Sequence, residues 1–113
     1  MLEIVCLLLD HGADVEAKNN DGKAALQLAA EGGYDEVVKL LLERGADVNA
    51  RGWDGWTPLH GASENGMLEA VRLLLEHGVN VEAKNYNSET ALQVAVRYGR
   101  NKVVKLLREH GAK

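Results

Sequence analysis

The sequence predicts an all-α solenoid of stacked helix-turn-helix units whose connections project as β-hairpin-like tips. The first observation is a period of 33 residues, at which leucines and alanines recur together with the glycines at positions 12, 45, 78 and 111. The second is a segment that recurs four times with small changes, as "EIVCLLLDHGADVEAKN", "EVVKLLLERGADVNARG", "EAVRLLLEHGVNVEAKN" and "KVVKLLREHGAK". Units this short cannot bury their apolar faces alone, so they must stack on one another.

Each unit is expected to contain two short helices. In "TPLHGASEN" the side chain of Thr57 is placed to cap the first helix, and Pro58 stands at the first helical position, where its missing N–H costs nothing. Gly66 is expected to end this helix. The second helix carries the apolar run "VRLLL", wider than one buried face requires, so neighbouring units must cover it. Gly78 then closes the second helix, and an extended segment leads to the next unit.

The residues Thr57-Pro58-Leu59-His60-Gly61-Ala62 match the T-P-L-H-x-A signature, and "GADVNA" at 45–50 resembles the inter-repeat segment of ankyrin repeats. The resemblance covers essentially the whole chain. It implies an L-shaped stack in a single domain, residues 1–113, from a family whose usual work is binding other proteins. Within it we expect a partial repeat at 1–18, full repeats at 19–51 and 52–84, and a C-terminal capping repeat at 85–113.

Departures from the family pattern carry their own expectations. Ser88 stands where the other hairpins have Gly22 and Gly55, so the last hairpin should accept backbone strain. Gly61 replaces an apolar residue found at this slot in the neighbouring units. Since glycine costs ~1 kcal/mol relative to alanine inside a helix, Gly61→Ala is expected to raise the unfolding midpoint.

The two ends of the array are expected to differ. Arg108 replaces a leucine of the earlier units, as a polar closing cap would. At the other end the chain begins at a second helix, which leaves the apolar residues of 1–11 without a covering first helix. We expect a monomer whose open end frays, with end-to-end association of two chains through this end as the alternative. An alternative is that the chain is a structural spacer or fragment of a longer ankyrin array in a multidomain regulatory protein.

Composition narrows the functional classes. The formal net charge of −4 gives no reason to expect nucleic-acid or membrane binding. The single cysteine, Cys6, rules out an intrachain disulfide and suggests a reducing compartment. The apolar run at residues 2–9 has no basic leader and is too short to span a membrane. An intracellular, cytoplasmic location is therefore expected.

No pattern indicates catalysis, a cofactor or a metal. His11, His77 and His110 share one slot before the glycine that ends the second helix, where a cation complements the helix C-terminus. They stand one or two repeats apart and do not converge readily on a metal. His60 matches the family's structural histidine, which hydrogen-bonds backbone at the helix start. Carboxylates recur with the repeat, and no phosphate-binding loop or nucleophile elbow is present, so we expect a protein that is not an enzyme.

The surface expected to bind a partner consists of the hairpin tips and the concave face of the first helices. Its variable slots hold five basic and five acidic residues, which argues against nucleic acid. The same slots hold four of the five aromatic residues, and interfaces are enriched in Trp and Tyr. We therefore predict a non-catalytic protein-binding module with Trp53, Trp56, Tyr86 and Tyr98 as exposed apolar contacts and Asp54, Glu64, Arg97 and Lys84 as polar contacts around them. The alternative for the tips is that Trp53 stacks on Tyr86 and only stiffens the hairpins.

Overall fold

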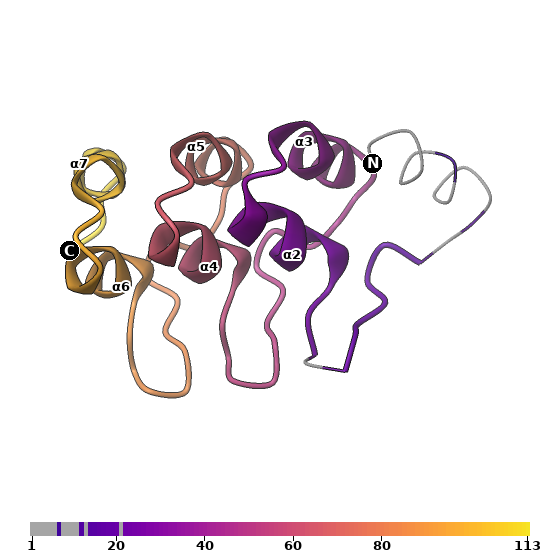
Figure 1. Ribbon diagram of the computed structural model, residues 1–113, viewed down its shortest axis with the longest axis horizontal. Coiled ribbons are helices and arrows are strands. Elements are labelled where there is room, and N and C mark those ends of the chain that lie inside the picture. The colour runs from indigo at the N-terminus through magenta and orange to yellow at the C-terminus, as the bar shows by residue number, and fades with distance from the viewer. Residues whose placement is uncertain (1–6, 8–11, 13, 21) are drawn as a thin grey trace.

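Helices alternate with projecting loops in the computed structural model, which describes Leu7, Gly12 and residues 14–20 and 22–113. Within these residues the helices are α2 (Ala25–Gly32), α3 (Asp35–Glu43), α4 (Pro58–Glu64), α5 (Leu68–Glu76), α6 (Ala91–Arg97) and α7 (Asn101–Glu109). Figure 1 shows α2, α4 and α6 in one row, α3, α5 and α7 in a second, and the hairpins projecting below the first. The predicted all-α solenoid is confirmed. The uncovered helix expected at residues 1–11 lies, apart from Leu7, outside the described residues.

The inner helices begin where side chains satisfy their first backbone groups. Thr57 Oγ1 accepts the N–H of His60 at 3.3 Å, and Pro58 occupies the first turn of α4, which confirms the predicted cap. Ala24 offers no such hydroxyl at the start of α2. There the Oε1 of Gln27 accepts the N–H of Ala24 at 2.7 Å and holds the helix start from inside.

Leucine, valine and alanine fill the core between the two rows. In α5, Val71 and Leu74 are completely buried because α3, α4 and α7 all pack against this helix. Burying each such side chain contributes ~1.5–3 kcal/mol relative to leaving it in water. No tryptophan or tyrosine of the described residues belongs to this core. The largest fully buried apolar side chains are Leu26, Val38, Leu41, Leu59, Val71, Leu74, Val94, Val103 and Leu107.

Hydrogen bonds repeat at the unit spacing where successive extended segments meet. Lys18 Nζ donates to the carbonyl oxygen of Arg51 at 2.9 Å, and Arg51 Nη1 donates to that of Lys84 at 2.6 Å. A second series runs from backbone N–H groups to side-chain oxygens of the preceding unit. These bonds fix each hairpin relative to the next. The second series joins Asp47 to Glu16 (2.8 Å), Asn80 to Asn49 (2.8 Å) and Lys113 to Glu82 (3.2 Å).

One buried hydroxyl of α4 lacks a partner. Ser63 is fully buried, and its Oγ makes no hydrogen bond. The equivalent residue of α2 is Ala30, which is equally buried. Because an unsatisfied buried hydroxyl costs ~1–3 kcal/mol, and alanine is also the better helix former, we expect Ser63→Ala to raise the free energy of unfolding by ~1 kcal/mol or more. Urea denaturation measures this gain. A loss of stability would mean that Ser63 bonds within the helix in solution.

The structure changes the expectation for Gly61. A Cβ at this position would lie 3.1 Å from the Cβ and 3.2 Å from the Oε2 of Glu31 on α2, closer than comfortable van der Waals contact. The carboxylate of Glu31 is held by Lys23, and its carbonyl oxygen accepts a bond from Asn65 at 2.9 Å. Glu31 therefore yields little. The helix-propensity gain of ~1 kcal/mol is opposed by an overpacking cost of similar size, so Gly61→Ala should not raise the thermal midpoint.

Candidate functional site

The hairpin tips are held by backbone hydrogen bonds and left-handed corners. In the tip at 52–56 the N–H of Gly52 donates to the carbonyl oxygen of Trp56 at 2.9 Å, and Gly55 has φ of 78°. The following tip has the same turn with Ser88 at φ 61°, the one residue other than glycine with positive φ in the described chain. The expected backbone strain in the last hairpin is confirmed. A side chain in this region costs ~1–2 kcal/mol.

Two aromatic rings project from these tips. Trp53 is 68% exposed and Tyr86 is 71% exposed. Each ring lies over the glycine of the preceding hairpin, since a Cβ at Gly22 would lie 2.4 Å from Trp53 Cδ1 and one at Gly55 would lie 2.8 Å from Tyr86 Cδ1. Trp53 therefore leans on glycine, and no ring contact with Tyr86 occurs. One face of each ring supports the hairpin stack, and the rest remains open to solvent.

Trp56 is placed differently from the exposed position expected for it. Its side chain is half-buried on the concave face, where its ring packs against that of His60 with centroids 5.4 Å apart and an interplanar angle of 54°. The backbone N–H of Trp56 donates to Asp54 Oδ1 at 3.0 Å, and its backbone carbonyl oxygen accepts from Gln27 Nε2 at 2.8 Å. Trp56 thus links its hairpin to both α2 and α4, whereas the ring of Trp53 lies over Gly22 of the neighbouring tip.

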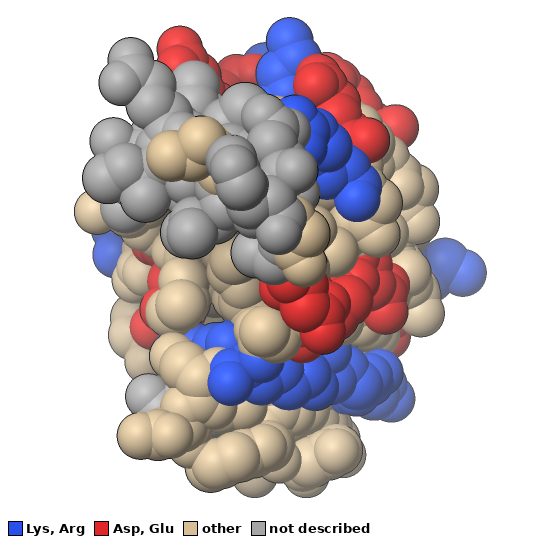
Figure 2. Space-filling view, turned by 90° about the vertical axis from the view of Figure 1, so that its right-hand side faces the viewer, with Lys and Arg blue, Asp and Glu red and all other residues tan. Residues whose placement is uncertain are grey.

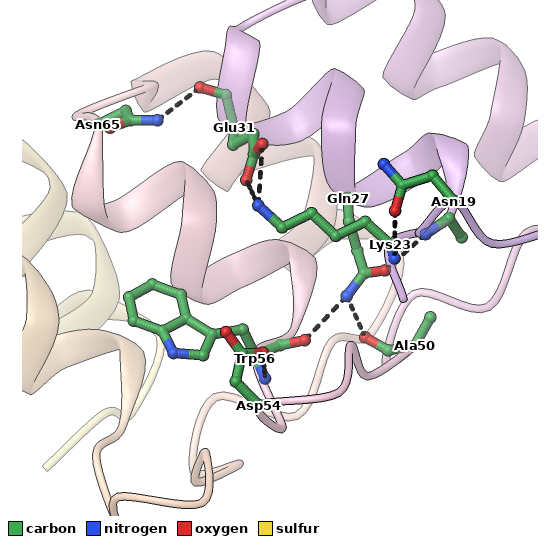
Figure 3. Close-up of polar contacts among 9 residues, drawn as sticks. Asn19, Lys23, Gln27, Glu31, Ala50, Asp54, Trp56 and Asn65 are labelled. Atoms are coloured by element: carbon green, nitrogen blue, oxygen red, sulfur yellow. Dashed lines mark hydrogen bonds and ion pairs between the residues drawn. The ribbon is translucent and has the colours of Figure 1, made fainter. Parts of the chain in front are cut away.

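A cleft of about 210 Å³ opens between α2, α4 and this hairpin. Figure 3 shows the Lys23 side chain extending toward Glu31 above the backbone of Asp54 and Trp56. Lys23 Nζ pairs with Glu31 Oε2 at 3.1 Å across the cleft wall. Three of the predicted contact residues, Asp54, Trp56 and Glu64, meet here. The complete lining is Lys23, Gln27, Glu31, Asp54, Trp56, Thr57, Gly61 and Glu64.

The other predicted contact residues lie apart from this cleft. Arg97 forms an ion pair with Glu89 and stacks over the ring of Tyr98, with its guanidinium carbon 5.1 Å from the ring centroid. Tyr98 is 48% exposed at the end of α6. Lys84 belongs to the series of bonds between extended segments, through its backbone carbonyl. The predicted residues therefore form a cleft, two tips and a cluster on α6 instead of one patch.

Charge is distributed in bands on this part of the molecule. Figure 2, which views the end of the stack that carries α2, shows mostly uncharged surface over the hairpin tips at the bottom of the view. A band of Lys and Arg lies above the tips, followed by a band of Asp and Glu.

His60 is structural. Its ring is fully buried, its Nδ1 accepts the N–H of Thr57 at 3.2 Å, and its Nε2 therefore donates to the carbonyl oxygen of Glu89 in the next hairpin at 2.7 Å. Burial is the main cause that lowers the pKa of His60 below its ordinary value of 6.5, so the ring is neutral at pH 7. Gln27 makes the equivalent bond to Trp56 in the preceding unit.

The remaining histidines of the described chain also bond to backbone. The Nδ1 atoms of His77 and His110 lie 2.9 and 3.0 Å from the carbonyl oxygens of Leu73 and Leu106, four residues earlier. This geometry satisfies helix C-termini, as their shared slot predicted. Among the described residues, no group of three or more His, Cys, Asp and Glu side chains could hold a metal ion. His11 and Cys6 lie outside the described residues.

Sequence reasoning missed part of the cleft. Gln27 and Gly61 line it from the inner helices, and Lys23 and Glu31 close one side as an ion pair. The signal available was the repeat alignment, which places Gly61 in the slot of Val94 and thereby marks a missing side chain. The ion pair of Lys23 with Glu31 joins a hairpin to the end of a helix, so helical spacing in the sequence does not predict it.

These features define a class of protein, a solenoid of repeated helix pairs that presents hairpin tips and a concave helical face. A family model for ankyrin repeats (three copies) matches residues 1–52 and 50–113, so the chain belongs to the ankyrin repeat family. A search of curated proteins gives no match. Ankyrin repeats are generally protein–protein interaction modules and are generally not enzymes. In the part of the chain that the structure describes, no helix is long and apolar enough to cross a membrane.

Proposed function

We propose that this protein binds a protein partner through its hairpin tips and concave face, without catalysis. The observation that carries the proposal is the placement of the aromatic residues. Trp53, Tyr86 and Tyr98 are exposed on the hairpins and at the end of α6, while the apolar core of the described residues contains no Trp or Tyr. Exposed rings of this size supply large contact area with few rotatable bonds, which is why Trp and Tyr concentrate in the centres of interfaces.

The polar residues around these rings are suited to selecting the partner. Asp54 and Glu64 face the cleft, and Arg97 stands beside Tyr98 with its charge shared by Glu89. Because Arg97 is already paired, the cleft carboxylates offer the stronger field to an incoming group. Lys84 contributes less, since its carbonyl group is engaged in the hairpin series and its side chain stands apart from the cleft.

Affinity capture with the intact chain as bait tests the proposal. The bait should retain a specific protein, and a Trp53→Ala/Trp56→Ala variant should lose it. Tyr34→Ala provides the matched control, because Tyr34 is an exposed ring at the start of α3, away from hairpins and cleft. Retention of the same protein by the double variant would contradict the proposed surface. Absence of any specific protein would favour the alternative of a structural spacer.

A further inference from the structure

Gly61 forms part of the wall of the cleft between α2 and α4. The slot of Gly61 holds the fully buried Val94 in the next unit and Leu28 in the preceding one. With glycine at this position, about 210 Å³ remains open beside Trp56 and Thr57. This volume is smaller than the ~300–1,000 Å³ of most small-molecule sites. It suits a single side chain.

The charge of the cleft is acidic once internal pairs are removed. Lys23 is matched by Glu31 at 3.1 Å, so this pair adds no net charge. Asp54 uses Oδ1 to accept the backbone N–H of Trp56, and it forms no ion pair with a described residue. In the described part of the chain, the carboxylate of Glu64 has no hydrogen-bond or ion-pair partner. The eight residues that line the cleft therefore include three Asp and Glu against one Lys.

An aromatic ring completes the lining. Trp56 is half-buried and braced by His60, so it contributes a fixed ring to the cleft. Indole faces attract cations, and guanidinium groups stack on them while donating to carboxylates. We propose that the cleft receives an arginine side chain of the protein partner, with its guanidinium on Trp56 and its N–H groups donating to Asp54 and Glu64. This assignment rests on the proposed function and names the chemistry of its central contact.

Arginine fits these features better than lysine. Its planar group offers five N–H donors in a fixed fork, which two carboxylates on different elements can share. A lysine ammonium is a compact and strongly hydrated charge, and it loses more solvation on entering a cleft with an aromatic wall. The acidic excess around the cleft also steers a basic partner toward this face.

The test uses the intact ¹⁵N-labelled protein and N-acetyl-L-arginine methylamide as probe, followed by NMR. The indole N–H signal of Trp56 should shift in a saturable way, while that of the exposed Trp53 provides an internal reference. The uncharged citrulline derivative should produce no such shift, and the lysine derivative should bind more weakly. Equal response to the citrulline derivative, or equal movement of both indoles, would overturn the assignment.

Two variants sharpen the result. Glu64→Gln keeps the shape and removes one carboxylate, so the dissociation constant for the arginine derivative should rise by about fivefold or more. Gly61→Val fills the cleft with the residue found in the next unit, and should abolish the shift in a chain whose fold is verified by circular dichroism. Glu43→Gln is the matched control, an exposed carboxylate on α3 outside the cleft. Unchanged affinity in Glu64→Gln would contradict the proposal.

This test can fail separately from the proposed function. Suppose the captured partner binds the wild type and Glu64→Gln equally but does not bind the Trp53→Ala/Trp56→Ala variant. The proposed binding surface is then supported and the arginine assignment is contradicted. If the arginine derivative binds in the cleft while no protein is captured through the aromatic residues, the chemistry of the cleft stands and the proposed surface falls.

Discussion

Replacing His60 with alanine is expected to lower the free energy of unfolding by about 3–5 kcal/mol, the largest single effect outside the apolar core. The ring is fully buried and bridges the start of α4 to the carbonyl of Glu89 in the next hairpin. Alanine leaves a cavity and an unpaired N–H at Thr57, and it removes the bond to the carbonyl oxygen of Glu89, which then accepts only the N–H of Asn85. Two units are therefore weakened at once. Urea unfolding followed by circular dichroism measures the loss.

Glutamine is the informative control at this position. Gln27 occupies the same slot of the preceding unit, where its side chain accepts from Ala24 and donates to Trp56. His60→Gln should therefore retain both hydrogen bonds and lose less than half as much stability as His60→Ala. If both variants lost the same amount, the contribution of His60 would be the volume of its ring and not its bonds.

The free energy of unfolding is also expected to depend on pH, and this dependence should differ between the wild type and His60→Gln. Burial lowers the pKa of His60 below its ordinary value of 6.5, so the unfolded chain binds the proton more readily than the folded one. The stabilising effect of the neutral ring is therefore complete above pH 6.5 and is lost as the pH falls from there toward the folded pKa. The slope approaches ~1.4 kcal/mol per pH unit for one proton. His60→Gln should remove this slope between pH 6.5 and 5, and equal slopes in both proteins would contradict it.

Much of the fold was predictable because the repeat superimposes weak local signals. A single threonine before a proline is a weak signal for the start of a helix. At Thr57 the signal is stronger, because the repeat places leucines and glycines at equal intervals on either side. The strain at Ser88 was predictable for the same reason, since two earlier hairpins place glycine at that corner. Periodicity thus fixed the backbone conformation even where the residue departs from the pattern.

The site was less predictable because it depends on distances between units. The sequence left open the alternative that Trp53 stacks on Tyr86, whereas in the structure the ring of Trp53 lies over Gly22 of the preceding hairpin. An equal number of acidic and basic contact residues suggested a neutral surface. The cleft itself is acidic, because Lys23 forms an ion pair with Glu31 while Glu64 forms no ion pair with a described residue. Sequence reasoning selects which residues share a face, and three-dimensional packing decides which of them neutralise one another.

The two tryptophans are expected to separate binding from stability. Trp56 packs on His60, whereas Trp53 is 68% exposed. Trp53→Ala should weaken binding of an identified partner by ~2 kcal/mol or more, about thirtyfold. The free energy of unfolding of this variant should fall by only ~0.5–1 kcal/mol, because only the contact of the Trp53 ring with Gly22 is lost.

Trp56→Ala should reduce both quantities, because the half-buried ring supports His60 and also lines the cleft. We expect a loss of ~2 kcal/mol in unfolding free energy and a loss of affinity at least as large as that of Trp53→Ala. Calorimetric titration of the partner beside urea unfolding of the same variants gives both numbers, with Tyr34→Ala as the exposed ring that should leave affinity unchanged. If Trp53→Ala lost stability sharply while its affinity stayed intact, the tip rings would serve the hairpin stack and the binding surface would have to lie elsewhere.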